Sequence, residues 1–285
     1  MSAGVRADAA RRAMSEVRIG CAGWAIPAAH RDRFGEGASA LARYATRLHC
    51  VEINSSFHRS HKRETYARWA DAVPARFRFA VKMPRTISHD ARLQRCGRLL
   101  DAFLHECGGL GSKLGCVLLQ LPPSLVLDAR VAARFLAMLR RRWDGAVACE
   151  PRHASWFTVR ADALLQRHNV ARVAADPAPH PGAEMPGGDR TFAYWRWHGS
   201  PRMYYSAYGD ERLREQARAV SAAARDARES WIVFDNTAHG HATDDALRFA
   251  TMALPDRRAA AKGRARLYGP DSAPPRRKIG AADER

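Results

Sequence analysis

One pattern recurs along this chain and limits what it can fold into: a short apolar run, a polar cluster, then a segment with helical periodicity. Eight apolar runs occupy residues 18–24, 50–56, 78–84, 115–122, 145–152, 171–177, 191–199 and 230–237. Seven segments between or after them space apolar residues three and four apart, at 39–48, 62–72, 98–108, 128–142, 159–168, 210–226 and 243–254. The sixth connection, 177–190, is rich in Pro and Gly and is predicted to be a loop. Strands that alternate with helices indicate parallel pairing through crossovers.

Eight strand–helix units in about 240 residues match the usual size of a (β/α)8 barrel. The alternative is an open doubly wound sheet, in which a glycine-rich turn after the first strand binds a dinucleotide. Here Gly20-Cys-Ala-Gly23-Trp24 lacks the third glycine and the helix start. The sequence therefore predicts an α/β protein, a single TIM-like (β/α)8 barrel over 17–255, with a disordered N-terminus at 1–16 and a basic disordered tail at 256–285.

The net charge of +18 is unevenly distributed and is dominated by arginine. From Arg257 onward, nine basic and three acidic residues occur without a sustained apolar period, which is typical of disorder. Such a tail can bind nucleic acid nonspecifically through the phosphates, or it can be no more than a solvated terminus. The Arg and Ala bias of the whole chain is also what a GC-rich coding sequence produces, so the charge alone does not establish a nucleic-acid partner.

The six cysteines, at 21, 50, 96, 107, 116 and 149, form no C-x-x-C pair, and four of them lie in strand-like apolar runs. There a cysteine behaves as a small hydrophobic residue. No apolar run reaches the length of a membrane span, and no secretory signal is visible at the start. We therefore expect a reduced, cytoplasmic protein without a membrane partner. The composition excludes collagens, coiled coils and disulfide scaffolds.

Polar side chains interrupt the apolar runs near their C-terminal ends, and several recur two residues apart, on one face of a strand. In a barrel these strands would direct them into one mouth, where such enzymes place their chemistry. A structural ion-pair network that caps the barrel is the alternative, because buried charges must be paired. Two tryptophans beside the first and fifth strand ends could form walls for a planar ligand or pack in the core. The predicted set is Trp24, Glu52, Asn54, Lys82, Gln120, Glu150, Arg152, Trp156, Asp176, Arg196, His198 and Asp235.

Seven stretches, in order along residues 17–254, resemble the YecE-like family, domain of unknown function 72. They are Gly20-Cys-Ala-Gly23-Trp24, Val51-Glu52-Ile53-Asn54-Ser55-Ser56-Phe57, Arg78-Phe79-Ala80-Val81-Lys82, Leu119-Gln120-Leu121-Pro122-Pro123, Glu150-x-Arg152-His153-x-x-Trp156, Arg196-x-His198-Gly199 and Phe234-Asp235-Asn236-Thr237. The resemblance implies a TIM barrel and a site at these motifs, including Asn236, but no established activity. Two departures are Ala148-Cys149 before Glu150, where the family usually has Ala-Val, and Asp235, where Asn is common.

The predicted mouth can be interpreted in two ways. Without a metal, Lys82, Arg152 and Arg196 would hold a phosphate or carboxylate, Glu150 or Asp176 would act as general base, and His153 or His198 as general acid. Lys82 could also form a Schiff base, although a salt bridge to Glu52 or Glu150 is the simpler role. With a metal, Glu150, Asp176, Asp235 and His198 would bind a divalent cation, as in sugar-isomerase-like and nuclease-like barrels.

The basic side chains beside these carboxylates would repel a cation, and no H-x-H or H-E-x-x-H spacing occurs, so we predict no metal and no cofactor. The working hypothesis is an enzyme that uses acid/base chemistry on a small anionic or polyhydroxylated ligand. The alternatives are a metal-dependent sugar-isomerase-like barrel, a nucleic-acid-processing barrel, and a noncatalytic binder of a ligand or nucleic acid. The sequence indicates no oligomeric state.

Overall fold

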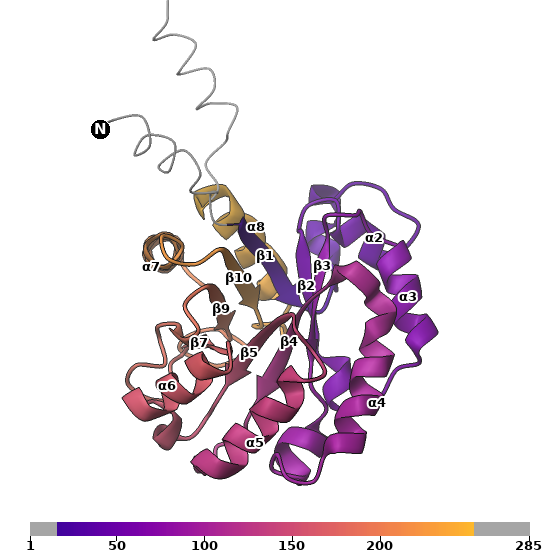
Figure 1. The fold of residues 1–285 in the computed structure, drawn as a ribbon. Helices are drawn as coiled ribbons and strands as arrows, with labels where there is room; N and C mark the ends of the chain where they lie inside the picture. The colour runs from indigo at the N-terminus through magenta and orange to yellow at the C-terminus, as the bar shows by residue number, and fades with distance from the viewer. Residues whose placement is uncertain (1–15, 254–285) are drawn as a thin grey trace, which may run out of the picture.

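The computed structural model describes residues 16–253, which form a barrel of strands surrounded by helices (Figure 1). The predicted α/β barrel is confirmed, and every crossover between consecutive strands of the predicted eight gives a parallel pair. The disordered segments predicted at 1–16 and 256–285 lie outside the described residues, apart from Glu16, which begins the first strand.

The strands follow the chain around the barrel, in the order β7-β9-β10-β1-β2-β3-β4-β5-β6-β8. Their bounds are β1 Glu16–Ala22, β2 Cys50–Ile53, β3 Arg78–Lys82, β4 Leu114–Gln120, β5 Ala146–Glu150, β6 Ala171–Arg172, β7 Ala174–Asp176, β8 Gly187–Gly188, β9 Phe192–Trp197 and β10 Glu229–Phe234. Each predicted apolar run overlaps at least one of these strands.

The barrel closes through its sixth strand, which is split into β6 and β7 on either side of Val173. The first half pairs with β5 and the second half with β9. Between them, the backbone N–H of Val173 donates to the carbonyl of Cys149 at 2.8 Å. The predicted loop at 177–190 contains no helix, as expected, but it does contribute β8, which pairs antiparallel with β6.

Seven α-helices cover the outside of the barrel, close to the predicted ranges (Figure 1). They are α2 Ala40–Tyr44, α3 Arg63–Asp71, α4 Gly97–Cys107, α5 Ala129–Arg140, α6 Val159–Arg167, α7 Asp210–Ala223 and α8 His241–Ala253. Side-chain caps fix three of the starts, because Ser39 accepts from a backbone N–H group of α2, Asp128 from two of α5 and Thr158 from one of α6. Among residues 16–253, none of the helices combines the length and apolar character that crossing a bilayer requires.

Five single-turn elements lie in the connections and were not predicted. They are the 3-10 helices η1 Ala28–Arg33, η2 Ser55–Phe57, η4 Gly108–Lys113 and η5 Ala154–Trp156, and the π-helix η3 Thr86–Asp90. Periodicity cannot reveal elements of three to six residues, because they are shorter than the windows in which apolar spacing is readable. Three of them, η2, η3 and η5, directly follow strand ends and therefore shape the surroundings of the site.

The core has two parts, one between the strands and the helices and one inside the barrel. Inside, small side chains from one half of the barrel face aromatic ones from the other, where Tyr194 and Trp231 stack at 5.9 Å. The interior set is Cys50, Ala80, Cys116, Leu118, Ala148, Ala171, Val173, Phe192, Tyr194, Trp231 and Val233. Because side chains alternate along a strand, the next inward positions toward the C-terminal ends fall on the predicted polar residues. The apolar layer therefore closes the barrel beneath them.

Candidate functional site at the C-terminal ends of the strands

A cluster of charged and polar side chains lies on this apolar layer; we call it the mouth cluster. Its members come from β2, β3, β4, β5, β9 and β10 and from the residues just after them. They are Glu52, Lys82, Gln120, Glu150, Arg152, Arg196, His198 and Asp235, all among the predicted residues, together with Tyr194. Hydrogen bonds link all of them except Lys82. The sequence therefore predicted the membership of this cluster well.

Arg196 is at the centre of the mouth cluster and is completely buried. Its guanidinium binds Glu52 through two hydrogen bonds, Nε to Oε2 at 3.0 Å and Nη2 to Oε1 at 2.7 Å. It also donates to Glu150 Oε2 at 2.6 Å and to Asp235 Oδ2 at 2.8 Å. With three carboxylate partners and no exposed surface, Arg196 cannot hold a ligand anion. The expectation that it does so is wrong, and its role is to hold three buried carboxylates together.

Glu150 is the most heavily bonded carboxylate of the mouth cluster. Besides Arg196, it accepts from Gln120 Nε2 at 2.8 Å and from Arg152 Nη2 at 2.6 Å. Burial alone would raise the pKa of Glu150, but the guanidinium groups of Arg152 and Arg196 hold that pKa well below its ordinary value. Glu150 is therefore ionised at neutral pH and saturated with donors, which makes it a poor general base.

His198 lies between two carboxylates and one guanidinium. Its Nδ1 is 2.9 Å from Asp235 Oδ2, and its Nε2 is 3.0 Å from both Glu150 Oε1 and Arg152 Nη2. As an imidazolium, the ring donates from Nε2 to Glu150. As a neutral ring protonated at Nδ1, it accepts at Nε2 from Arg152. Both ring nitrogens of His198 are therefore engaged within the cluster.

Asp235 is the carboxylate with the most open surroundings. Its Oδ2 accepts from Arg196 and His198, while Oδ1 has no hydrogen-bond partner among residues 16–253. Burial raises the pKa of Asp235, but Arg196 and His198 outweigh that effect and lower it overall. Its side chain is 11% exposed, whereas those of Glu52 and Glu150 are 0% and 2% exposed. A free, ionised oxygen therefore faces the outer side of the cluster.

Lys82 lies at the end of β3, and its ammonium group is 4.3 Å from the centre of the Phe57 ring. Within the described chain it makes no hydrogen bond or ion pair through Nζ, so the expected salt bridge to Glu52 or Glu150 is wrong. Burial and then the charge of Arg196 lower the pKa of Lys82 to about 8, although Glu52, Glu150 and Asp235 oppose the shift. Lys82 is the cation of the mouth cluster with no committed partner.

Two further predicted residues retain unpaired polar atoms. Arg152 engages through Nη2 only, and its buried Nε has no hydrogen-bond partner among the described residues. Asn54 follows β2 in line with Glu52, and its buried Oδ1 also has no partner there. Buried polar atoms are nearly always hydrogen-bonded, so a ligand or an ordered water is the natural partner of both.

Asp176 is not part of the mouth cluster, and the expectation that it shares the mouth is wrong. It ends β7 on the outward face, where its carboxylate accepts from Arg212 at 2.9 Å and Gln216 at 3.1 Å, both on α7. Its backbone partner in β9 is Trp197, not the inward Arg196. Asp176 alternates with Arg172 and Ala174, which also face outward, whereas Ala171 and Val173 face the interior; its place at the strand end did not decide its face.

Two predicted residues after β5 have structural roles instead. Trp156 is buried and donates from Nε1 to the carbonyl of Leu125 at 2.9 Å, so it is not a wall of the mouth. His153 caps η5, its Nδ1 accepting from the backbone N–H of Ser155 at 3.1 Å. That leaves His198, and not His153, as the imidazole within the cluster. A turn after a strand changes the direction in which side chains point, so alternation along the strand does not predict the orientation of residues beyond its end.

The two remaining predicted residues, Trp24 and Asn236, contact other elements. Trp24 packs edge-to-face on Trp69 of α3, with 5.1 Å between ring centroids. Asn236 donates from Nδ2 to the carbonyl of Ser206 at 2.9 Å and to Asp245 of α8 at 2.7 Å. Asn236 therefore holds the β9–α7 loop and α8 together rather than lining the mouth.

Sequence reasoning missed three aromatic contributors. Tyr194 donates to Glu52 Oε2 at 2.8 Å, and its place two residues before Arg196, on the same strand face, was the available signal. Phe57 lies against Lys82, within a motif whose Phe had not been given a role. Tyr204 lies in the segment after β9, and its ring is 5.6 Å from that of His198 and nearly perpendicular to it.

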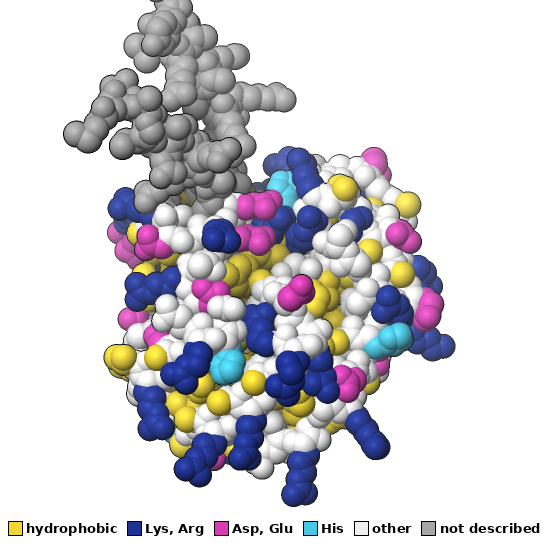
Figure 2. Space-filling view, viewed as in Figure 1, with side chains coloured by type: hydrophobic (Ala, Val, Ile, Leu, Met, Phe, Trp, Pro, Cys, Tyr) yellow, Lys and Arg dark blue, Asp and Glu magenta, His cyan; other side chains and the backbone are white. Residues whose placement is uncertain are grey.

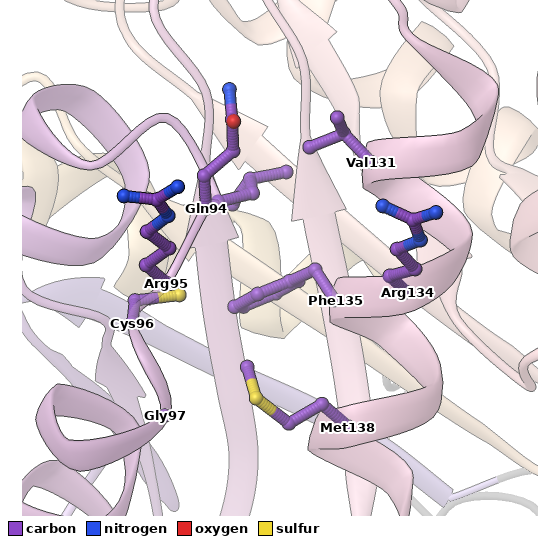
Figure 3. Close-up of a pocket in the computed structure, with 9 residues that line it drawn as sticks. Gln94, Arg95, Cys96, Gly97, Val131, Arg134, Phe135 and Met138 are labelled. Carbon is purple, nitrogen blue, oxygen red and sulfur yellow. The ribbon is translucent and has the colours of Figure 1, made fainter.

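Most side chains of the mouth cluster are buried, and four hollows lie elsewhere, two of which border the segments near α4. One of about 330 Å³ separates α5 from the segment before α4, and Figure 3 shows Arg134, Phe135 and Met138 of α5 facing Arg95 and Cys96 across it. Another of about 300 Å³ lies between the segments after β2 and β3. Neither includes a member of the cluster. In Figure 2, basic side chains project around the lower part of the view, over α4, α5 and α6.

Within residues 16–253, no group of three or more His, Cys, Asp or Glu side chains has a geometry that could hold a metal ion. The arrangement explains this result, because Arg196 occupies the space between the three carboxylates that a dication would need. What the geometry can do is bind a ligand to Lys82 and Arg152 and transfer protons through His198 and Asp235.

Comparison with known proteins agrees with the motifs. Residues 18–267 match the family described as "Protein of unknown function DUF72". The chain belongs to the DUF72 family. A curated relative, UPF0759 protein YecE of Escherichia coli (strain K12), is 32% identical over 149 residues, which are 50% of this chain and 54% of the relative. The same-named protein of Escherichia coli O157:H7 is 38% identical over 86 residues, 30% of this chain and 32% of that one. The aligned part spans about half or less of these relatives.

Solved DUF72 structures share the fold. A DUF72 protein of Enterococcus faecalis V583 superposes with a TM-score of 0.71 at 22% identity, covering 84% of this chain and 96% of that one. One from Thermotoga maritima MSB8 gives 0.69 at 22% identity, covering 83% and 98%. These likenesses concern the barrel fold only. The family match continues from 256 to 267, past the boundary predicted at 255.

Proposed function

We propose that this DUF72 barrel is an enzyme that uses acid/base chemistry on a small anionic or polyhydroxylated ligand, bound at the C-terminal ends of the strands. One observation carries the proposal: the ammonium of Lys82 makes no hydrogen bond or ion pair in the described chain and its Nζ remains open to solvent, although the side chain is largely buried and lies near three carboxylates. A structural ion-pair cap would engage every cation of the cluster, because charged groups at the edge of an apolar core are stabilised by pairing. A cation without a protein partner is better explained by a ligand that binds to it.

Ligand binding would fall to Lys82, Arg152 and Asn54. Lys82 supplies a compact positive charge, and Arg152 supplies the N–H groups that Glu150 and His198 leave free. Asn54 supplies an amide oxygen, which accepts from a hydroxyl group. Anionic oxygens and hydroxyls together satisfy these donors and this acceptor, which is why the ligand class is anionic or polyhydroxylated.

Proton transfer would fall to His198 and Asp235. The ring of His198 is hydrogen-bonded in both protonation states, and Oδ1 of Asp235 is an ionised acceptor directed away from Arg196. General acid/base catalysis needs groups of this kind within hydrogen-bond reach of the ligand. Glu52, Glu150 and Arg196 would position this pair.

Binding is tested with inorganic phosphate and a panel of sugar phosphates and sugar acids, measured by calorimetry. We expect Lys82→Met and Arg152→Met each to weaken binding more than tenfold, since a charge-assisted hydrogen bond contributes about 1.5–3 kcal/mol. The matched control is Arg212→Gln, which removes a cation that binds Asp176 outside the cluster. Unchanged affinity in both mouth variants, or an equal loss in the control, would contradict the proposal.

Acid/base chemistry is tested on the ligands that bind. In D₂O, wild-type protein should exchange a carbon-bound hydrogen of the bound ligand for deuterium, followed by NMR. His198→Gln should bind the same ligand but exchange it at least about a hundredfold more slowly. Binding without exchange in the wild type would indicate a noncatalytic ligand-binding barrel.

The six cysteines bear on the compartment. All are buried and unpaired in the structure, and burial raises their pKa values, which keeps the thiols protonated. Free thiols in this number support our proposal that the protein works in a reducing compartment such as the cytoplasm.

A further inference from the structure

The position of Lys82 supports a more specific role, which rests on the proposed function and names its substrate class. We propose that Lys82 forms a Schiff base with the carbonyl carbon of a small, polar aldehyde or ketone. Three independent features lead to this inference: the placement of the amine, its lack of partners, and the groups arranged around it.

Placement comes first. Lys82 is the last residue of β3, and its strand neighbour two residues earlier, Ala80, lies in the apolar interior of the barrel. Its amine therefore lies just above this apolar layer, at the end of the barrel to which the other strands direct their polar side chains. Only 9% of Lys82 is exposed, and the ring of Phe57 covers one side. A site from which water is largely excluded favours an imine, because water is the product of its formation.

The second feature is that the amine is free to react. The other two lysines of the described chain differ: Lys113 donates to the carbonyls of Ala70 and Val73, and Lys62 is exposed. Lys82 neither donates hydrogen bonds as Lys113 does nor is fully exposed to solvent as Lys62 is. With a pKa of about 8, roughly a tenth of its amines are unprotonated at pH 7, compared with fewer than about one in a thousand for an ordinary lysine. Only the unprotonated amine is a nucleophile.

The third feature is the supply of protons. The Nζ lone pair attacks the carbonyl carbon and forms a C–N bond, while the C=O π pair moves to oxygen, which takes a proton. The nitrogen then loses a proton, the hydroxyl takes a second one, and the C–O bond breaks as water leaves with its electron pair. Amine, carbonyl and one proton give a protonated imine and water, without any change of oxidation state. Asp235 is the group placed to accept and return these protons, because its Oδ1 has no partner among residues 16–253, while His198 holds its Oδ2 through Nδ1.

An anion-binding role for Lys82 alone fits less well. Anion sites usually converge several donors on one position, and here the most strongly basic group, Arg196, is fully committed to carboxylates. The charges of Glu52, Glu150 and Asp235 also lie near Lys82 and reduce its attraction for an anion. A neutral carbonyl carbon is not affected in this way, and an acidic or hydroxyl group elsewhere on the ligand can still bind Arg152.

The test is reductive trapping. Full-length protein is incubated separately with glycolaldehyde, dihydroxyacetone and pyruvate, then reduced with sodium borohydride and digested with trypsin. Trypsin does not cleave after an alkylated lysine, so a trapped adduct at Lys82 appears as one uncut peptide, residues 79–85, heavier by the mass of the probe less one oxygen atom. The chain has only five lysines, which makes the position unambiguous.

We expect at least one probe to modify Lys82 at least tenfold more than Lys62, and Lys82→Met to remove that adduct while Lys62→Met leaves it unchanged. Should the Lys82 variant fail to fold, the peptide from the wild type still decides the matter. Equal labelling of the two lysines, or no adduct from any probe, overturns the proposal. If anion binding that depends on Arg152 persists in that case, the Schiff base is wrong and the proposed function stands; if that binding is absent as well, both fail.

Discussion

At the scale of single residues, the mouth cluster separates charges that hold the barrel together from charges that remain free to act. Arg196 is the clearest member of the first group, with three carboxylate partners and no exposure. Lys82 is the clearest member of the second. The sequence indicated that both would lie in the mouth, but it could not show which carboxylate pairs with which cation. That depends on distances between residues far apart in the chain, such as Glu52 and Arg196.

Replacing Arg196 with Ala should destabilise the protein by about 3–5 kcal/mol, because three carboxylates would remain buried without their common partner. Arg152→Ala is the matched comparison, since it removes a guanidinium that binds one of the same carboxylates from a side chain that is 12% exposed. Its loss should amount to about 1–3 kcal/mol. Urea unfolding measures both; an Arg196 variant as stable as the Arg152 variant would show that the cluster is not held together in this way.

Lys82→Met should stabilise the protein, whereas Arg196→Ala should destabilise it. The folded protein lowers the pKa of Lys82 from 10.5 to about 8, so between these values the unfolded chain binds a proton that the folded chain does not. Wild-type stability therefore rises with pH across that interval, and below pH 8 the full penalty applies. At pH 7 the substitution should stabilise the fold by about 1–3 kcal/mol.

The advantage of the Lys82→Met variant over wild type should shrink as pH increases from 8 toward 10. Urea unfolding at pH 7 and pH 9.5 measures it, with the exposed Lys62→Met as control. A variant less stable than wild type at pH 7 would mean that the Lys82 ammonium is paired and stabilising.

At the scale of the elements, the strands and helices were predictable because each produces a periodic pattern over enough residues. The short helices after the strand ends were not, and they decide where Trp156 and His153 point. The face of Asp176 was predicted wrongly, because its place at the strand end was given more weight than its alternation with Arg172 and Ala174, which face outward.

Close contact between β1 and β2 provides a test at this scale. A Cβ at Gly20 would lie 2.0 Å from the carbonyl oxygen of Cys50, which belongs to the neighbouring backbone and cannot move aside freely. Gly20→Ala should therefore destabilise the barrel by at least about 2 kcal/mol.

Gly209→Ala is the control for this substitution. Nothing lies within 4 Å of a Cβ there, and its φ is −71°, so the change should stay within about 1 kcal/mol. Similar unfolding curves for the two variants would mean that the strands do not approach as closely as the structure has them.

At the scale of the whole molecule, the barrel places its apolar layer below and its polar layer at the C-terminal ends of the strands. The sequence predicted this gradient because apolar residues fill the strand centres and polar residues their ends. It could not predict that most side chains of the polar layer would be buried, since that depends on how Arg196 reaches Glu52 across the barrel.

The tail supplies a prediction from the sequence alone, as it lies outside the described residues. Removing 257–285 should leave the melting temperature within a few degrees, because a polar, non-periodic segment buries little apolar surface. It should also abolish salt-dependent binding to DNA, which we propose arises from the nine basic residues there. Calorimetry and DNA titration at two salt concentrations measure these effects. A large loss of melting temperature that is restored by keeping 257–267 would extend the domain to the end of the family match.

The account depends above all on Lys82 being an uncommitted amine in the mouth, and NMR of protein labelled at lysine Cε measures this directly. The five lysines give five signals, each titrating with its own pKa. One signal should titrate near pH 8 and be absent from Lys82→Met. Five signals that all titrate at the ordinary lysine value would contradict the account, because Lys82 would then be hydrated or paired like any surface lysine.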